Sequence, residues 1–301
     1  MKEFREIKSI SQMHHLLGLN KPMHPAISLV NMKDVKLSKE LFNQKYIWDF
    51  YMISLKFENC ELQYGRQYYD FEEGTLVFSS PGQVFEAKKQ PETLNENGWA
   101  LYFHSDLIQK SDLGKNIKSY GFFSYKSNEA LHLSEKEKEK ISRCIDAIED
   151  ECQQNIDKHS QTVIVSNLEL LLNYCNRFYD RQFYTRSTHQ QDVVEKIEEL
   201  LVNFFNSDNS VKQGIPTVKF CADQVNLSPN YLSDLLKKET GKNTQEHIHF
   251  HLIEKAKNLL LSSNASVSGI AYDLGFEYPQ SFGTLFKKKV GMSPNKYRQL
   301  N

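Results

Sequence analysis

An internal repeat near the C-terminus constrains the fold of this chain more than any other feature. Two segments match at an offset of fifty residues: YLSDLLKKETG from Tyr231 and SFGTLFKKKVG from Ser281. One inserted residue in the turn before them then aligns Val225 with Leu274. Each copy is predicted to be a short helix, a tight turn and a longer helix, which is the helix-turn-helix arrangement.

Capping and helix-breaking residues set the expected bounds of the two longer helices. Ser228 lies directly before a proline, and a serine N-cap followed by proline at the first helical position starts a helix well. Gly241 and Gly291 lie where a left-handed C-terminal residue is needed. The longer helices are therefore predicted to cover residues 229–240 and 279–290.

Each longer helix is predicted to have one buried and one polar face. Apolar residues recur at helical spacing, and they are Leu232, Leu235, Leu236, Phe282, Leu285 and Phe286. A polar face that ends in lysines suits entry into a DNA groove, because the first helical turn reaches base edges while later lysines meet phosphates. The predicted DNA contacts are Asn230, Tyr231, Ser233, Asp234, Lys237, Lys238, Gln280, Ser281, Gly283, Thr284, Lys287 and Lys288.

A connecting helix is predicted from Thr244 to about Leu261. Its roughly 18 residues, at about 1.5 Å of rise each, span about 27 Å. This length is near one DNA turn of about 34 Å, so one molecule is expected to reach two successive major grooves. Asn230 and Gln280 can each pair with adenine through two hydrogen bonds.

The last hundred or so residues resemble the DNA-binding domain of the AraC/XylS family of transcription regulators. The resemblance rests on the first unit, the connecting helix and the second unit, which read FCADQVNLSPNYLSDLLKKETGK, IEKAKNLL and IAYDLGFEYPQSFGTLFKKKVGMSPNKYR. It implies a seven-helix domain that contacts double-stranded DNA through both longer helices and controls transcription initiation, with RNA polymerase as a further partner. The alternative is a helical bundle with an accidental repeat.

The chain departs from the frequent family pattern at two positions. Asp234 and Thr284 lie where many members have a basic or long polar residue. An aspartate that faces DNA repels phosphates unless it accepts a hydrogen bond from a cytosine amino group. The base preference of relatives therefore does not transfer to this chain.

Residues 46–104 are predicted to form short antiparallel strands. The run YIWDFYMISLKF is rich in aromatic and β-branched residues, and TLVF and WALYFH are further candidates. These strands predict a small β-barrel or sandwich. Two helices follow, one opened by a capping box at Ser134 and Glu137 and one from about Ser160 to Tyr179. The fold class is thus α+β.

Polar residues in RQFYTRSTHQ suggest a linker near residue 185, with the next helix starting at about Gln191. The predicted domains are residues 1–185 and residues 186–301. The first domain resembles the cupin-like sensing and dimerisation domain of such regulators, which implies a small-molecule effector and a homodimer. The two helices after the strands form the dimer interface or cover the barrel.

Composition and charge narrow the class of protein. With 40% hydrophobic and 25% charged residues, the chain has the composition of a globular protein. No apolar run approaches the roughly 18 residues of a membrane span, and no signal peptide is visible, so a cytoplasmic location without membrane contact is expected. The net charge is −1, but residues 216–301 carry eleven Lys and Arg against seven Asp and Glu. This local excess suits a surface that faces phosphates.

An enzyme built on the strand region is the rival class. A cupin enzyme needs a metal held by several histidines and a carboxylate, and the strand region contains only His104. No catalytic residue and no cofactor are predicted. The alternative function is a metal-independent, small-molecule-binding cupin-like protein, or a cupin enzyme, with an accessory DNA-binding domain. The aromatic residues that line an effector pocket or fill the core are Trp48, Phe50, Tyr51, Tyr102 and Phe103.

Metal binding is not favoured elsewhere. The five cysteines are odd in number and contain no CxxC pair, so neither a disulfide framework nor a thiolate zinc site is indicated. His247 and His251 have the i, i+4 spacing that can hold zinc on one helical face. The sequence indicates no cysteine or carboxylate partner for them, so no metal is predicted.

Overall fold

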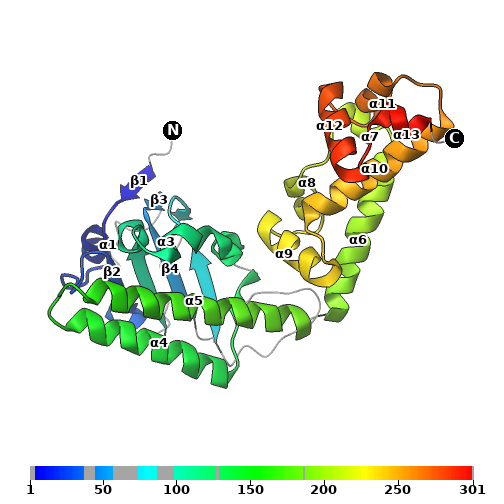
Figure 1. The fold of residues 1–301 in the computed structure, drawn as a ribbon. Coiled ribbons are helices and arrows are strands. Elements are labelled where there is room, and N and C mark those ends of the chain that lie inside the picture. The colour runs from blue at the N-terminus through cyan, green and yellow to red at the C-terminus, as the bar shows by residue number, and fades with distance from the viewer. Residues whose placement is uncertain are drawn as a thin grey trace. The chain divides into compact units, whose positions relative to one another are not determined.

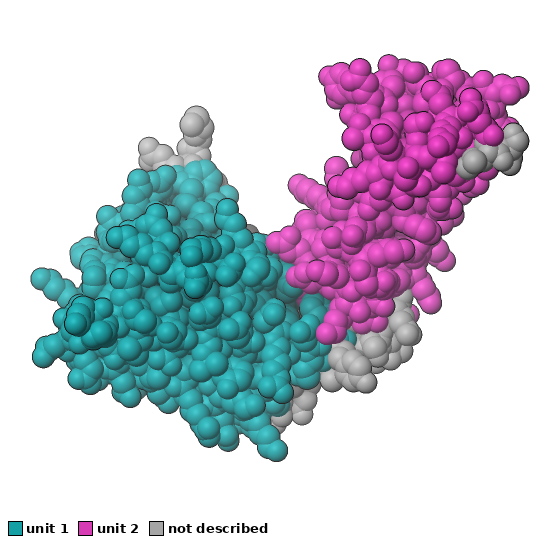
Figure 2. Space-filling view, viewed as in Figure 1, with its two compact units in different colours: residues 1–185 teal, residues 186–301 magenta. Residues whose placement is uncertain are grey.

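The chain divides into two compact units, residues 1–185 and residues 186–301 (Figures 1 and 2). The computed structural model describes residues 4–36, 45–56, 74–86, 98–126, 129–185 and 187–299. Strands lie in the first unit, and the second unit is helical, which confirms the α+β class.

The described strands of the first unit form two sheets. One sheet has the order β2-β7-β4-β5-β8, with every neighbouring pair antiparallel. The other has the order β1-β3-β6, in which β1 and β3 are parallel. The strands are β1 (Phe4–Ile7), β2 (Ile27–Asn31), β3 (Lys45–Trp48), β4 (Phe50–Lys56), β5 (Thr75–Ser79), β6 (Val84–Glu86), β7 (Trp99–His104) and β8 (Leu131–His132).

Of the two predicted arrangements, a small barrel or a sandwich, the described strands do not form a closed barrel. The run YIWDFYMISLKF does not form one strand, because the chain changes sheet at Asp49, a residue type that is depleted in strands. Residues before Asp49 pair in the three-stranded sheet and those after it pair in the five-stranded sheet. In the described part of the chain, β2 and β8 remain the edges of an open sheet.

The aromatic residues of the strands fill the core. Phe50, Tyr102 and Phe103 are buried, with at most 5% of each residue exposed. The rings of Trp48 and Tyr102 stack with their centroids 5.5 Å apart, and those of Tyr51 and Phe103 stack with their centroids 4.9 Å apart. These contacts favour the core interpretation of the aromatic residues over an effector pocket lined by them.

Two long helices, α4 (Glu135–Gln153) and α5 (Ser160–Thr185), lie side by side in the first unit (Figure 1). The predicted capping box at Ser134 and Glu137 is present at the start of α4. Buried aliphatic residues on both helices, such as Ile145 and Leu171, supply the apolar surface that holds them in place. The shorter helical elements are α1 (Ile10–Leu16), η1 (Met32–Asp34), α2 (Ser105–Ile108), α3 (Asp112–Asn116), η3 (Ile117–Ser119) and η4 (Gly121–Ser124).

The predicted linker near residue 185 is largely helical. Helix α5 continues to Thr185, and α6 (Ser187–Asn206) starts two residues later, before the predicted start at Gln191. The stretch RQFYTRSTHQ contains neither glycine nor proline, and its polar residues cost little in a helix. The boundary between the two compact units falls between residues 185 and 186.

The second unit contains the two predicted longer helices with the expected bounds. They are α9 (Pro229–Thr240) and α12 (Pro279–Val290), and each is closed by a glycine in the left-handed region, Gly241 at φ 78° and Gly291 at φ 86°. The helix α7 was not predicted. The other helices are α7 (Asn209–Gln213), α8 (Val218–Gln224), α10 (Thr244–Ser262), α11 (Val267–Asp273) and α13 (Pro294–Arg298).

Candidate nucleic-acid interface

Helix α9 has a buried apolar face and an exposed polar face. The Ser228 side chain accepts a hydrogen bond from the backbone N–H of Tyr231 at 3.2 Å, which caps the helix. Leu232, Leu235 and Leu236 are at most 2% exposed. Asn230 in the first turn and the lysines of the last turn are exposed to solvent, as predicted for a surface that faces DNA.

Three of the predicted contacts in α9 are not exposed on this face. Tyr231 is only 4% exposed, so its ring belongs to the core and not to a base-reading surface. The Ser233 hydroxyl donates to the carbonyl of Pro229 at 2.9 Å and lies 3.1 Å from the hydroxyl of Thr244. Asp234 is half-buried. The exposed predicted residues of α9 are therefore Asn230, Lys237 and Lys238.

Helix α12 repeats the arrangement with larger core residues. Phe282 and Phe286 are fully buried, and Leu285, predicted to be buried, is half-buried. A Cβ built on Gly283 meets no atom within 4 Å, so the protein itself does not require glycine there. The exposed predicted residues of α12 are Gln280, Ser281, Thr284, Lys287 and Lys288.

The two turns that precede α9 and α12 both contain a residue in the left-handed region. Asn226 takes φ 58° in the first turn, and Gly275 takes φ 88° in the second. A Cβ on Gly275 would lie 2.7 Å from the carbonyl oxygen of Ser210 and from the carbonyl carbon of Gly214. The Ser210 hydroxyl also donates to the carbonyl of Asp273 at 2.8 Å. Helix α7 thus fixes the second turn by close backbone contact.

Helix α10 connects the two copies. Near its start it contacts α9, and at its end Arg298 of α13 donates hydrogen bonds to the carbonyls of Leu260 at 3.2 Å and Ala265 at 2.7 Å. Its 19 residues, at about 1.5 Å of rise each, span about 28 Å. The two copies therefore lie toward opposite ends of one helix within the second unit (Figure 1).

Known proteins match this part of the chain. A family described as "Helix-turn-helix domain" matches residues 221–300. The uncharacterized HTH-type transcriptional regulator YobQ of Bacillus subtilis is 37% identical over 82 residues, which cover 27% of this chain and 34% of YobQ. The HTH-type transcriptional activator RhaS of Escherichia coli is 41% identical over 78 residues, which cover 26% of this chain and 28% of RhaS.

The second unit is an AraC-type helix-turn-helix domain. Among solved structures, the C-terminal domain of AraT, a response regulator from Geobacillus stearothermophilus, is similar at 31% identity and a TM-score of 0.32, covering 36% of this chain and 85% of that one. The match spans about a third or less of the length of YobQ and RhaS. It therefore concerns the AraC-type domain and not the first unit.

The AraC-type domain has basic residues that the sequence analysis missed. Lys289 is exposed beside Lys287 and Lys288 at the end of α12. His249 of α10 has a lowered pKa, first because burial disfavours its charged form and then because of the charges of Lys289 and Lys288. The basic end of α12 thus acts electrostatically on α10. The run of three lysines is visible in the sequence, whereas the effect on His249 depends on the tertiary fold.

The histidine pair at the start of α10 does have a carboxylate partner. Glu198 of α6 contacts His247 Nδ1 through Oε1 at 2.6 Å and His251 Nε2 through Oε2 at 2.5 Å. The expectation that no carboxylate lies nearby is therefore wrong, because the partner is 49 residues away in the sequence. Among the residues described, no group of three or more His, Cys, Asp or Glu side chains has an arrangement that could hold a metal ion.

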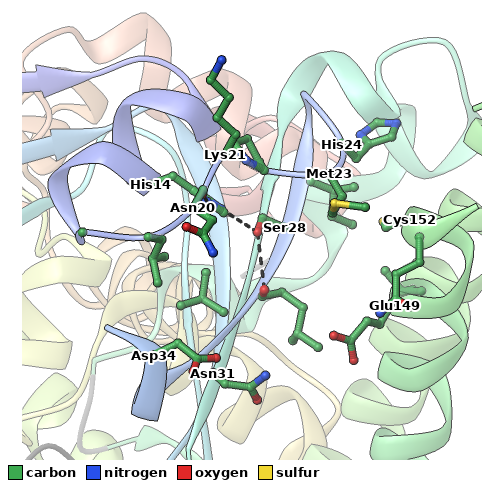
Figure 3. A pocket seen from close by; sticks show the side chains of 18 of the residues that line it. His14, Asn20, Lys21, Met23, His24, Ser28, Asn31, Asp34, Glu149 and Cys152 are labelled. Atoms are coloured by element: carbon green, nitrogen blue, oxygen red, sulfur yellow. Dashed lines mark hydrogen bonds between the residues drawn. The ribbon is translucent and has the colours of Figure 1, made fainter. Parts of the chain in front are cut away.

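The first unit contains a hollow of about 450 Å³ between residues 14–36 and helix α4. His14 donates from Nδ1 to the carbonyl of Asn20 at 2.5 Å, and its Nε2 lies 2.8 Å from Ser28 Oγ. Glu149 and Cys152 line the opposite wall (Figure 3). Burial raises the pKa of the Cys152 thiol to about 11, so it is a neutral thiol at physiological pH.

Four of the five cysteines lie among the described residues. Cys144, Cys152, Cys175 and Cys221 are free thiols, and Cys60 lies outside the described residues. Within the ranges that the structure describes, no helix has the length and apolar character required to span a bilayer.

Proposed function

We propose that this chain is a sequence-specific DNA-binding transcription regulator that reads two successive major grooves with α9 and α12. The observation that carries the proposal is the repeated surface of the AraC-type domain. Each helix buries its apolar side, exposes an amide side chain in its first turn, and ends in exposed lysines. An element of this kind suits a major groove, where side chains read base edges and lysines meet phosphates.

The exposed residues suggest a division of roles. Asn230 and Gln280 are proposed to pair with bases, because each lies exposed in the first turn of its helix and carries an amide that suits adenine. The proposed phosphate contacts are Lys237, Lys238, Lys287 and Lys288, with Lys289 added. Ser281, Gly283 and Thr284 border this surface on α12, and Ser233 and Asp234 border it on α9.

The first unit is proposed to be a cupin-like sensing and dimerisation domain in a cytoplasmic regulator that also contacts RNA polymerase. The hollow beside α4 is proposed as the effector site, since about 450 Å³ falls within the range of small-molecule pockets. Ser28, Asn31 and Glu149 supply polar groups there. An effector that binds the DNA-competent arrangement of the chain more tightly than the incompetent one would raise the affinity for DNA. The increase is at most the ratio of the effector's affinities for the two arrangements.

Selection of bound sequences from random DNA with the full chain tests the proposal. We expect enrichment of one site with two conserved blocks whose centres lie about 10 base pairs apart, one helical turn. A Lys287→Ala variant selected in parallel should enrich the same blocks with weaker binding. A pool without any enriched sequence would contradict sequence-specific binding, and a single block would contradict reading by both helices.

A further inference from the structure

A hydrogen-bonded cluster joins three helices of the AraC-type domain and has no part in the proposed DNA contacts. Glu198 lies on α6, His247 and His251 lie one turn apart on α10, and Thr240 is the last residue of α9. His247 Nε2 lies 2.7 Å from Thr240 Oγ1, while its Nδ1 contacts Glu198. The side chains of His247 and His251 are 5% and 13% exposed, whereas that of Glu198 is 38% exposed and Thr240 is exposed, so the two histidines form the buried side of the cluster.

The contacts of Thr240 and His247 link the end of α9 to α10 and α6. The Glu198 carboxylate can only accept, so His247 Nδ1 donates to it. The Thr240 hydroxyl lies 2.8 Å from the carbonyl oxygen of Leu236 and 2.7 Å from His247 Nε2, and it accepts from the backbone N–H of Lys242 at 3.3 Å. One side chain at the end of α9 therefore contacts both its own helix and α10.

The internal repeat shows that this contact belongs to one copy only. The offset of fifty residues places Val290 of α12 at the position of Thr240, and valine has no hydroxyl. Lys237 and Lys238, the proposed phosphate contacts of α9, lie within the last turn before Thr240. Whatever holds Thr240 therefore also holds the basic end of α9.

We propose that Glu198 and His247 are positioning residues for α9, which fix its C-terminal turn against α10 and α6 through the Thr240 hydroxyl. His251 holds the second oxygen of Glu198 and so keeps the carboxylate in place. The inference rests on the proposed function for its effect on DNA. The clamp itself, meaning the contacts among Glu198, His247, His251 and Thr240, is independent of DNA.

The test compares Thr240→Val, which keeps the side-chain shape and removes the hydroxyl, with Thr240→Ser, which keeps the hydroxyl. Amide hydrogen exchange in the full chain, without DNA, is the first measurement. Thr240→Val and Glu198→Gln should each speed exchange in the last turn of α9 about two- to ten-fold, the loss expected for one hydrogen bond. Thr240→Ser should exchange as the unmodified chain does, and the end of α12 should stay unchanged in all variants.

Three exchange results would overturn the clamp. They are unchanged exchange at the end of α9 in Thr240→Val, equal acceleration in Thr240→Ser, and additive effects when Thr240→Val and Glu198→Gln are combined. A further measurement follows amide exchange after a chelator is added to the unmodified chain. If the chelator reproduced the effect of Glu198→Gln, the cluster would be a metal site and the proposal would fail.

DNA binding is the second measurement, made on the selected site and on sites in which one block is scrambled. Thr240→Val should weaken binding to the full site about two- to ten-fold. Because the proposed phosphate contacts Lys237 and Lys238 do not read sequence, a similar weakening is expected when the block read by α9 is scrambled. Unchanged binding to both DNAs would overturn the positioning role. If the unmodified chain preferred no sequence, the proposed function would fail, while the exchange data would still decide the clamp.

Discussion

Exposed polar side chains on α9 and α12 occupy equivalent positions but do not have equivalent surroundings. Asn230 and Gln280 both lie exposed in the first helical turn. The next polar positions differ in exposure, because Ser233 and Asp234 are half-buried while Ser281 and Thr284 are exposed, although the Thr284 hydroxyl donates to the carbonyl of Gln280 at 3.0 Å. The second helix therefore has more exposed polar side chains than the first, and single substitutions in α12 should be the more informative ones.

Gln280→Ala should relax the base preference at one position of the site. An amide that pairs with adenine through two hydrogen bonds contributes about 1–3 kcal/mol of discrimination. Lys287→Ala should instead weaken binding to all sequences evenly and lower the slope of affinity against salt concentration by about one. Titrations of both variants on site variants at several salt concentrations measure this. Equal losses on every sequence from both substitutions would contradict the assigned roles.

Lys289→Ala should raise the pKa of His249. Burial is the larger cause of the lowered pKa and stays in place, but one of the two repelling lysine charges is removed. The pH titration of the His249 imidazole signals by NMR in the full chain measures the change. Lys296→Ala, which removes an exposed lysine of α13, serves as the control. A His249 pKa that does not move would show that the charge of Lys289 does not act on α10.

His249 also makes the free energy of unfolding depend on pH. Its pKa in the folded protein is lower than the usual 6.5 of the unfolded chain. As pH falls below about 6.5, the unfolded chain therefore takes up a proton at His249 before the folded protein does. This group lowers the free energy of unfolding toward acid pH and has no effect well above 6.5, where both states are neutral.

Two glycines of the second copy, one in the turn and one at the end of α12, have different structural roles. Gly291 closes α12 in the left-handed region with open space around its Cβ position, whereas Gly275 in the preceding turn meets backbone of Ser210 and Gly214. Gly291→Ala should cost about 1 kcal/mol of unfolding free energy. Gly275→Ala should cost about 2–5 kcal/mol of unfolding free energy, because a clash of the added Cβ with backbone atoms adds to the same backbone strain.

Urea unfolding of the full chain, followed by amide exchange in α11 and α12, measures these two costs. The Gly291→Ala variant is the matched control, since it has the same change of residue in a similar backbone conformation. Similar costs for both substitutions would show that α7 does not hold the second turn.

Local signals predicted the elements, and contacts distant in sequence did not follow from them. The bounds of α9 and α12 were predictable because proline and glycine act on their own backbone. The extension of α5 to Thr185 and the start of α6 at Ser187 were missed because polar residues other than glycine and proline are tolerated in helices. The burial of Tyr231 could have been predicted, because it lies four residues before Leu235 on the same helical face.

The same limit applies to the candidate site. The exposed lysines and the first-turn amides could be placed on a surface from helical periodicity alone. Glu198 could not be joined to His247 from the sequence, because the two residues are 49 positions apart and no local pattern relates them. The strands divide between two sheets at Asp49, and this division depends on strand pairing, which composition does not reveal.

At the scale of the whole molecule, the two compact units predict separable folding. The AraC-type domain has its own buried core, which includes Leu232, Ile248 and Phe282. A fragment of residues 187–301 should therefore unfold in one cooperative transition and select the same two-block site as the full chain. Circular dichroism during urea unfolding and the random-DNA selection measure these properties. A fragment that lacked a cooperative transition would show that the domain depends on the first unit.

The different cores of the two copies affect how the AraC-type domain can be redesigned. Phe282 and Phe286 of α12 occupy the positions that Leu232 and Leu236 occupy in α9. A chimera carrying α12 in place of α9 would force two phenyl rings into space shaped for isobutyl groups, and overpacking of this kind costs about 1–3 kcal/mol. New base preferences should thus come from substituting solvent-facing residues one at a time, with the buried residues of each helix left unchanged.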